Sequence, residues 1–125
     1  MAKLLLPILA LLLASSGCKR SAYSLVGTWR PDHVRSGEDT GRRFNQDGTY
    51  EFWFKGSKID VKESGTYVLD GARLSIIRTE HRGSSGKVDS TPQKVESSIT
   101  WVNENQFKER YEDSGHLETA IWNRG

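Results

Sequence analysis

The sequence after residue 24 predicts an all-β domain, a small antiparallel up-and-down β-barrel of about eight strands. Apolar and polar residues alternate in short segments, and no segment shows a helical period. The dipeptides Asp47-Gly48 and Asp70-Gly71 are strong hairpin signals, because glycine adopts a positive φ at no steric cost. Closing such a meander removes exposed strand edges. A two-sheet β-sandwich remains the alternative, since strand patterning does not separate the two architectures.

Period-two alternation and turn residues divide the domain into strands. We expect them at residues 25–30, 42–44, 49–55, 65–69, 72–81, 93–102, 106–111 and 116–123. Pro31 ends the first strand because proline cannot donate to a central ladder. A mixed segment at 58–62 precedes the fourth strand, and the Gly- and Ser-rich segment 82–91 is expected to be a surface loop.

The faces expected to point inward carry many large side chains. The aromatic ones are Trp29, Tyr50, Phe52, Phe54, Tyr67, Trp101, Phe107 and Tyr111. The aliphatic ones include Leu74, Ile76, Val95, Ile99, Leu117 and Ile121. An eight-stranded barrel is either filled by side chains or holds one small ligand. The size of these residues favours a filled interior with a shallow pocket at the mouth, and an apolar ligand cavity remains the alternative.

The first residues follow the three-part pattern of a secretory signal. Lys3 provides a positive charge, residues 4–13 are mostly apolar, and small residues precede Cys18. The apolar run is too short for a membrane-spanning helix, which needs about 20 residues. We therefore expect a signal peptide at 1–17, a linker at 18–24 and one barrel domain at 25–125.

The sequence Ser15-Ser16-Gly17-Cys18 resembles the cleavage site of bacterial lipoproteins. The resemblance implies a diacylglycerol on the Cys18 thiol and an acylated amino terminus, a combination that anchors a protein stably to a membrane. Lys19, where inner-membrane lipoproteins have Asp, implies the periplasmic face of the outer membrane. The alternative is ordinary secretion, because Ala14 and Ser16 fit the small-x-small pattern of general signal peptidase. With one cysteine, the chain cannot form an internal disulfide.

Short motifs in the domain resemble those of small bacterial lipocalin-like proteins, in the wider group of lipocalins and fatty-acid-binding proteins. They are Gly27-Thr28-Trp29, Asp47-Gly48-Thr49-Tyr50, Gly65-Thr66-Tyr67 and Arg124. The resemblance implies that Trp29 closes one end of the barrel and that Arg124 packs over it. Such a cation–π contact contributes about 0.5 to 2 kcal/mol.

Charge and motif content argue against several functions. The formal net charge of +2 is too small to indicate nucleic acid as a partner. No Gly-x-Ser-x-Gly elbow is present, and His33, His81 and His116 lack metal-site spacing, so each is expected to be solvated. We expect no enzyme activity, catalytic residue, metal or cofactor.

Two hypotheses of function remain. In the first, the anchored barrel binds a small apolar ligand or a lipid at its mouth, in contact with Tyr50, Phe52, Trp101 and Tyr111. In the second, a filled barrel contacts or inhibits another envelope protein through loops 32–41 and 82–91. The outward-facing Trp53 and Ile77 would contribute to such an interface, because large apolar groups on a solvent face mark some partner surfaces.

Overall fold

A computed structural model describes residues 23–125 of the chain. The predicted signal peptide and Cys18, with most of the predicted linker, lie outside the described residues. In residues 23–125 no helix with the length and apolar character to cross a membrane is found.

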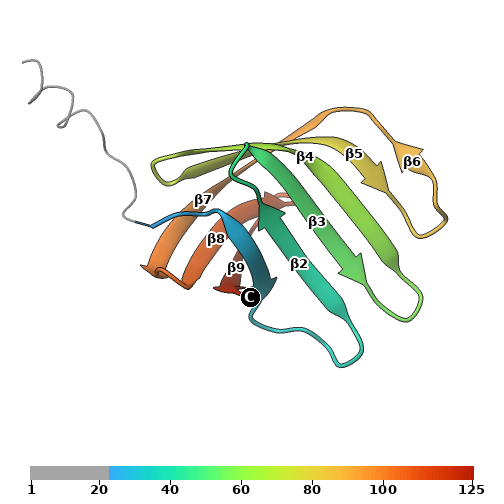
Figure 1. The fold of residues 1–125 in the computed structure, drawn as a ribbon, viewed down its shortest axis with the longest axis horizontal. Coiled ribbons are helices and arrows are strands. Elements are labelled where there is room, and N and C mark those ends of the chain that lie inside the picture. Colours follow the sequence, from blue (N-terminus) through green and yellow to red (C-terminus); the bar gives the residue numbers. More distant parts are fainter. Residues whose placement is uncertain (1–22) are drawn as a thin grey trace, which may run out of the picture.

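The described chain consists of strands joined by turns and loops (Figure 1). In chain order they are β1 (Gly27–Pro31), β2 (Asp39–Phe44), β3 (Thr49–Lys55), β4 (Asp60–Asp70), β5 (Arg73–Arg82), β6 (Val88–Asp89), β7 (Gln93–Asn103), β8 (Gln106–Asp113) and β9 (His116–Arg124).

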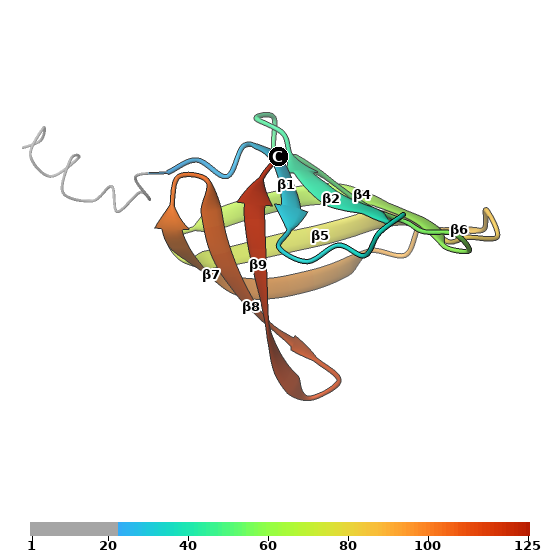
Figure 2. The same cartoon turned by 90° about the horizontal axis from the view of Figure 1, so that it is seen from below.

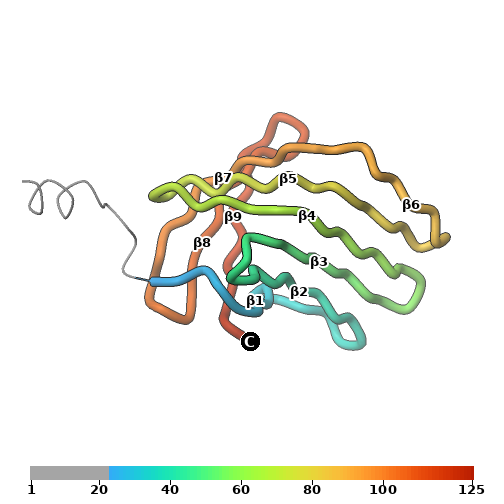
Figure 3. Tube along the Cα trace, turned by 45° about the horizontal axis from the view of Figure 1, so that its top comes forward, coloured from blue at the N-terminus to red at the C-terminus, as the bar shows by residue number. Residues whose placement is uncertain are grey.

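The strands form one sheet that closes on itself. Its order is β4-β3-β2-β1-β9-β8-β7-β5-β6, and a further antiparallel pairing between β4 and β5 joins the sheet into a barrel. Eight strands make up the barrel wall, and the short β6 pairs only with the far end of β5 (Figure 3). The predicted antiparallel barrel is therefore confirmed, and closure excludes the two-sheet sandwich.

The three largest departures from the predicted boundaries arise where a neighbouring strand supplies more pairing than the local sequence suggests. β2 starts at Asp39, inside the expected loop, because it pairs with β3 as far as Lys55. The expected mixed segment and fourth strand merge into the single β4, which pairs with β3 and β5 on either side. β6 forms within the expected loop 82–91.

A glycine permits the close approach of β4 to β5. The register shifts between Ser64 and Gly65, so that Ser64 pairs with Glu80 while Gly65 pairs with Arg78. A Cβ placed on Gly65 would overlap the backbone carbonyl oxygen of Ile77. This bulge turns His81 and Arg78 to the inner face together, next to Glu63.

The buried apolar core lies inside the barrel. It comprises Leu25, Trp29, Phe44, Tyr50, Leu74, Ile76, Ile99, Phe107 and Trp122, with Phe52, Tyr67, Leu69, Trp101 and Ala120 packed against it. Most expected inward residues are here, and Ile77 is 43% exposed on the outer face as expected.

The inward positions expected for β9 are wrong. Trp122 is buried opposite Phe107, which places Ile121 on the outer face, and Leu117 is 69% exposed. Leu117 lies near the tip of the β8–β9 hairpin, which projects beyond the body of the barrel (Figure 2). The segment contains apolar residues of both parities, so the alternation alone does not fix its face.

Candidate functional site

One end of the barrel interior holds an open cavity of about 320 Å³. Its lining residues come from β2, β3, β4, β5, β7, β8 and β9; they are Arg42, Tyr50, Phe52, Glu63, Ile76, Arg78, Val95, Glu109, Tyr111, Ala120 and Trp122. Three of the residues predicted to contact a ligand, Tyr50, Phe52 and Tyr111, are thus brought together. Val95 faces the interior as expected but is 44% exposed, because it lies at the open end. We call this space the open-end cavity.

Trp101, the fourth predicted ligand contact, does not line the open-end cavity. Its ring packs 5.9 Å from the ring of Trp29 and 5.5 Å from that of Phe107, between centroids. Those residues fill the opposite end of the barrel. Trp101 pairs with Phe107 on the neighbouring strand, and this register places it near the filled end of the barrel. The alternation pattern shows which face a residue is on but not its height along the barrel axis. The prediction that Trp101 lies beside Tyr50, Phe52 and Tyr111 is therefore corrected, because its ring belongs to the packed end of the barrel.

The closed end is completed by Arg124. Its guanidinium carbon lies 4.3 Å from the ring centroid of Trp29, the contact that the family resemblance implied. The Arg124 guanidinium also donates to the carbonyl oxygens of Val26 at 2.8 Å, Ser24 at 2.9 Å and Glu104 at 3.0 Å. These bonds join the chain before β1 to the β7–β8 turn. The end of the barrel opposite the cavity is thus closed by side chains.

The floor of the open-end cavity is a buried ion pair between Arg42 and Glu109. Arg42 donates from Nη2 to Glu109 Oε1 at 2.5 Å and from Nη1 to Oε2 at 3.3 Å. Ser97 Oγ donates to Oε2 at 2.7 Å, and Trp122 Nε1 donates to Oε1 at 3.1 Å. Glu109 therefore accepts hydrogen bonds at both oxygens from four donor atoms, as a buried carboxylate requires.

Aromatic rings surround the Arg42 guanidinium. Its central carbon lies 4.0 Å from the ring centroid of Trp122, 5.2 Å from that of Phe44 and 5.7 Å from that of Phe107. Cation–π attraction stabilises a desolvated guanidinium in such a setting. Arg42 Nε is buried and has no hydrogen-bond partner within residues 23–125.

A second ion pair lies at the mouth of the cavity. Arg78 donates from Nη1 to Glu63 Oε2 at 2.5 Å and from Nη2 to the side-chain oxygen of Gln93. His81 Nδ1 lies 2.6 Å from the same Glu63 oxygen. His81, whose inward direction follows from the bulge in β5, is 34% exposed and so remains partly solvated beside Glu63. His33 and His116 are exposed.

The two tyrosines of the cavity are held in their neutral form. Burial raises the pKa of Tyr50 above its usual value of 10.0, although the nearby Arg42 charge acts in the opposite direction. Burial is also the main cause that raises the pKa of Tyr111, followed by the charges of Glu118 and Glu109. Both hydroxyl groups keep their protons at neutral pH and can donate hydrogen bonds.

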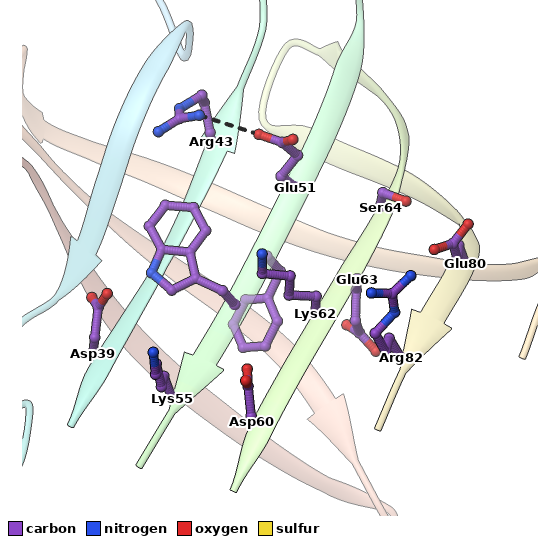
Figure 4. A pocket seen from close by; sticks show the side chains of 12 residues that line it. Asp39, Arg43, Glu51, Lys55, Asp60, Lys62, Glu63, Ser64, Glu80 and Arg82 are labelled. Carbon is purple, nitrogen blue, oxygen red and sulfur yellow. Dashed lines mark hydrogen bonds and ion pairs between the residues drawn. The ribbon is translucent and has the colours of Figure 1, made fainter. Parts of the chain in front are cut away.

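A groove of about 600 Å³ lies on the outer face of β2 to β5 (Figure 4). The Trp53 indole covers Gly41, with its Cζ2 atom 2.5 Å from where a Cβ of residue 41 would lie. The guanidinium carbons of Arg30 and Arg43 lie 5.8 Å and 5.7 Å from the indole centroid. Hydrogen bonds from the side chains of Trp53 and Arg30 lower the pKa of Asp39.

The outer groove carries charges of both signs. Arg43 pairs with Glu51 at 3.3 Å, and the groove is also lined by Lys55, Asp60, Lys62, Glu80 and Arg82 (Figure 4). Mixed charge gives such a surface no preference for a polyanion or a polycation.

The described residues offer no grouping of metal ligands. Within residues 23–125 no three His, Cys, Asp or Glu side chains are placed to hold a metal ion. The open-end cavity instead combines apolar walls with a few convergent polar groups, which is the usual composition of a small-molecule site.

Sequence reasoning missed Arg42, Glu109 and Trp122, the polar floor of the cavity. A signal for two of them was present in the period-two pattern. Glu109 alternates with Phe107 and Tyr111 on one strand, and Arg42 shares its face with Phe44 on another. An inward arginine and an inward glutamate in one small barrel predict a buried ion pair, because neither charge is stable there alone.

Comparison with known proteins found no matching family model, no matching curated protein and no matching solved structure.

Proposed function

We propose that this protein is a lipid-anchored protein of the bacterial cell envelope whose barrel holds one small, mainly apolar molecule. The observation that carries the proposal is the open-end cavity. Its volume of about 320 Å³ falls at the lower end of the range of small-molecule sites, about 300 to 1,000 Å³. This volume suits a single small ligand or one short acyl chain.

The contrast between the two ends of the barrel supports this function. Trp29, Trp101 and Phe107 fill one end, whereas the side chains at the other end leave the open-end cavity between them. Phe52, Ile76 and Trp122 offer apolar surface to a ligand there. Burial of that surface would provide most of the binding free energy, at about 25 cal/mol per Å² of apolar area.

The membrane location is proposed from the sequence. Cys18 would carry the lipid, and five residues separate it from Ser24, the last residue before the predicted domain. A tether of this length would keep the barrel close to the periplasmic face of the outer membrane. Apolar molecules and lipids are concentrated there, so a cavity of this kind would encounter them.

Native mass spectrometry of the full chain tests the proposal. The protein is exported in a bacterial host, purified from membranes into nanodiscs and released in the spectrometer without added ligand. We expect one retained molecule with the wild-type chain and none with Ala120→Phe, whose new ring would occupy the open-end cavity. Equal retention by both proteins would show that the retained molecule associates with the lipid anchor and not with the cavity. That result would contradict ligand binding in the barrel.

The outer groove favours a second candidate function, contact with another envelope protein. Trp53 presents a large aromatic surface there, and aromatic residues are enriched in protein interfaces. A photo-crosslinking residue at position 55, at the edge of the groove, tests this function in intact cells. Capture of one partner that is lost with Trp53→Ala would support it, and capture unaffected by this change would oppose it.

A further inference from the structure

We propose that the open-end cavity selects uncharged amphiphiles, such as alcohols or acylglycerols, and rejects carboxylates. The inference rests on the proposed function and adds the chemical class of its ligand. Its basis is that both cationic side chains lining the cavity, Arg42 and Arg78, are already paired with carboxylates of the chain, Glu109 and Glu63.

The floor pair leaves a ligand carboxylate without an unpaired positive charge, and Arg42 Nε, which has no partner within residues 23–125, is buried. The side chains of Arg42 and Glu109 are 5% and 8% exposed, and both terminal nitrogens of Arg42 bond to Glu109. A ligand carboxylate could form its own two-pronged ion pair with these nitrogens only by displacing Glu109. The displaced glutamate would then be buried without its cation, which is strongly unfavourable.

Placing a carboxylate beside the intact pair is also unfavourable. Glu109 and the ligand would then be two like charges in a partly desolvated space, and like charges close together oppose ionisation of both. Ser97 and Trp122 are not available as donors to the ligand, because both already donate to Glu109. The floor therefore presents a neutral surface to whatever enters.

The mouth of the cavity has the same balance. Arg78 bonds to Glu63 and to Gln93, and His81 lies against the same Glu63 carboxylate. The side chains of Arg78 and Glu63 are 25% and 19% exposed, so this pair too is largely shielded from water. A carboxylate approaching from outside would meet Glu63 as well as Arg78.

The cavity does offer groups that suit a neutral head group. The hydroxyls of Tyr50 and Tyr111 remain protonated at neutral pH, as their raised pKa values indicate. Each can donate one hydrogen bond to an alcohol or ester oxygen and accept one from a hydroxyl. A neutral head group loses less hydration free energy on burial than a carboxylate does.

Fluorine NMR of the full chain in nanodiscs can test the inference at a single residue. The chain has four tryptophans, which 5-fluorotryptophan labels together. Trp122 lines the open-end cavity, Trp53 lies on the outer face, and Trp29 and Trp101 fill the closed end. The probes are 1-octanol and octanoate, which share a chain length and differ in head-group charge. The resonance of Trp122 is assigned with Trp122→Phe.

In the wild-type protein we expect 1-octanol to shift the Trp122 resonance in a saturable way, with octanoate binding at least about tenfold more weakly. Removing one compensating carboxylate should reverse the preference. Glu109→Gln frees the charge of Arg42 at the floor, and Glu63→Gln frees that of Arg78 at the mouth. Each variant should strengthen octanoate binding about tenfold relative to 1-octanol binding. Comparing this ratio between variant and wild type cancels any difference in how the two probes partition into the nanodisc lipid.

Glu96→Gln is the matched control. It removes one carboxylate from an exposed ion pair with Lys94, 3.0 Å apart on β7, and should leave both affinities unchanged. Glu63→Gln keeps the test decisive if Glu109→Gln does not fold, because the mouth pair is partly exposed. Octanoate binding as tight as that of 1-octanol in the wild type would overturn the inference while leaving the proposed function standing. If neither probe shifts Trp122 in any variant, the proposed function fails and the inference fails with it.

Discussion

Arg42 on β2 and Glu109 on β8 form a buried ion pair across the inside of the barrel. Their strands are not neighbours, since β1 and β9 lie between them in the sheet. The pair therefore connects two separate parts of the barrel wall and at the same time forms the floor of the open-end cavity. A residue pair with both roles links the stability of the fold to the chemistry of the site.

Arg42→Met should destabilise the protein by about 3–5 kcal/mol, because it leaves the Glu109 charge buried without its cation. The double variant Arg42→Met/Glu109→Gln should recover most of that loss. The neutral amide that then replaces the Glu109 carboxylate can still accept the hydrogen bond from Trp122 through its oxygen, while its NH2 group can donate to the Ser97 hydroxyl. Urea unfolding followed by tryptophan fluorescence measures the free energy of unfolding of each protein. Equal destabilisation in the single and double variants would show that Arg42 contributes through packing on the aromatic rings alone.

Gly65→Ala should destabilise the barrel by about 2–4 kcal/mol. The added methyl group would overlap the carbonyl oxygen of Ile77, and relieving the overlap requires β4 and β5 to separate where they close the barrel. Gly41→Ala is the matched control: its methyl group would meet the Trp53 side chain, which can move, so the cost should be about 1 kcal/mol. Thermal unfolding by circular dichroism compares them. A larger loss for Gly41→Ala than for Gly65→Ala would contradict this account of the closure.

Arg124→Lys should reduce the free energy of unfolding by about 1–2 kcal/mol. A lysine keeps the charge but cannot reach three carbonyl oxygens at once while stacking on Trp29. The same conservative change at Arg43, which pairs with Glu51 on the exposed outer face, should cost less than about 0.5 kcal/mol. Urea unfolding measures both proteins. Similar small losses at the two positions would show that the closed end does not depend on the guanidinium geometry.

Trp101 and Tyr111 should separate stability from ligand binding. Trp101→Ala removes a ring from the packed closed end and should destabilise the protein by about 3 kcal/mol without changing the affinity of the open-end cavity. Tyr111→Ala removes a half-buried ring from the cavity lining and should weaken 1-octanol binding with a smaller loss of stability. Unfolding curves and the Trp122 fluorine signal measure the two effects. Weakened binding in a folded Trp101→Ala protein would restore Trp101 to the ligand site.

The all-β class, the closed barrel and most strands could be predicted because period-two alternation and Asp-Gly turns are local signals. The continuity of β4 and the start of β2 at Asp39 could not, since they depend on pairing with partners distant in sequence. A face assignment failed where apolar residues occupy both parities, as at Ile121 and Trp122.

The candidate site could be predicted only in part. Alternation identifies inward residues, and Tyr50, Phe52 and Tyr111, which it indicates, line the open-end cavity. It does not give the height of a residue along the barrel axis, which depends on strand tilt and register. For that reason alternation alone does not separate Trp101, at the closed end, from the residues that line the open-end cavity.

Tyr50→Phe should make the protein less sensitive to alkaline pH. Burial raises the pKa of Tyr50 in the folded protein, whereas in the unfolded chain its hydroxyl ionises near its usual value of 10.0. Above about pH 10 the unfolded state therefore releases a proton that the folded state retains, and the free energy of unfolding falls as pH rises. Below that pH the hydroxyl is protonated in both states and adds no pH dependence. The Tyr50→Phe variant has no such group, so its stability should decline less between about pH 8 and about pH 11 in urea unfolding experiments. Lysines and the other tyrosines titrate alike in both proteins and so do not affect the comparison. If the free energy of unfolding declined equally in both proteins, the Tyr50 hydroxyl would ionise freely in the folded state and be open to water.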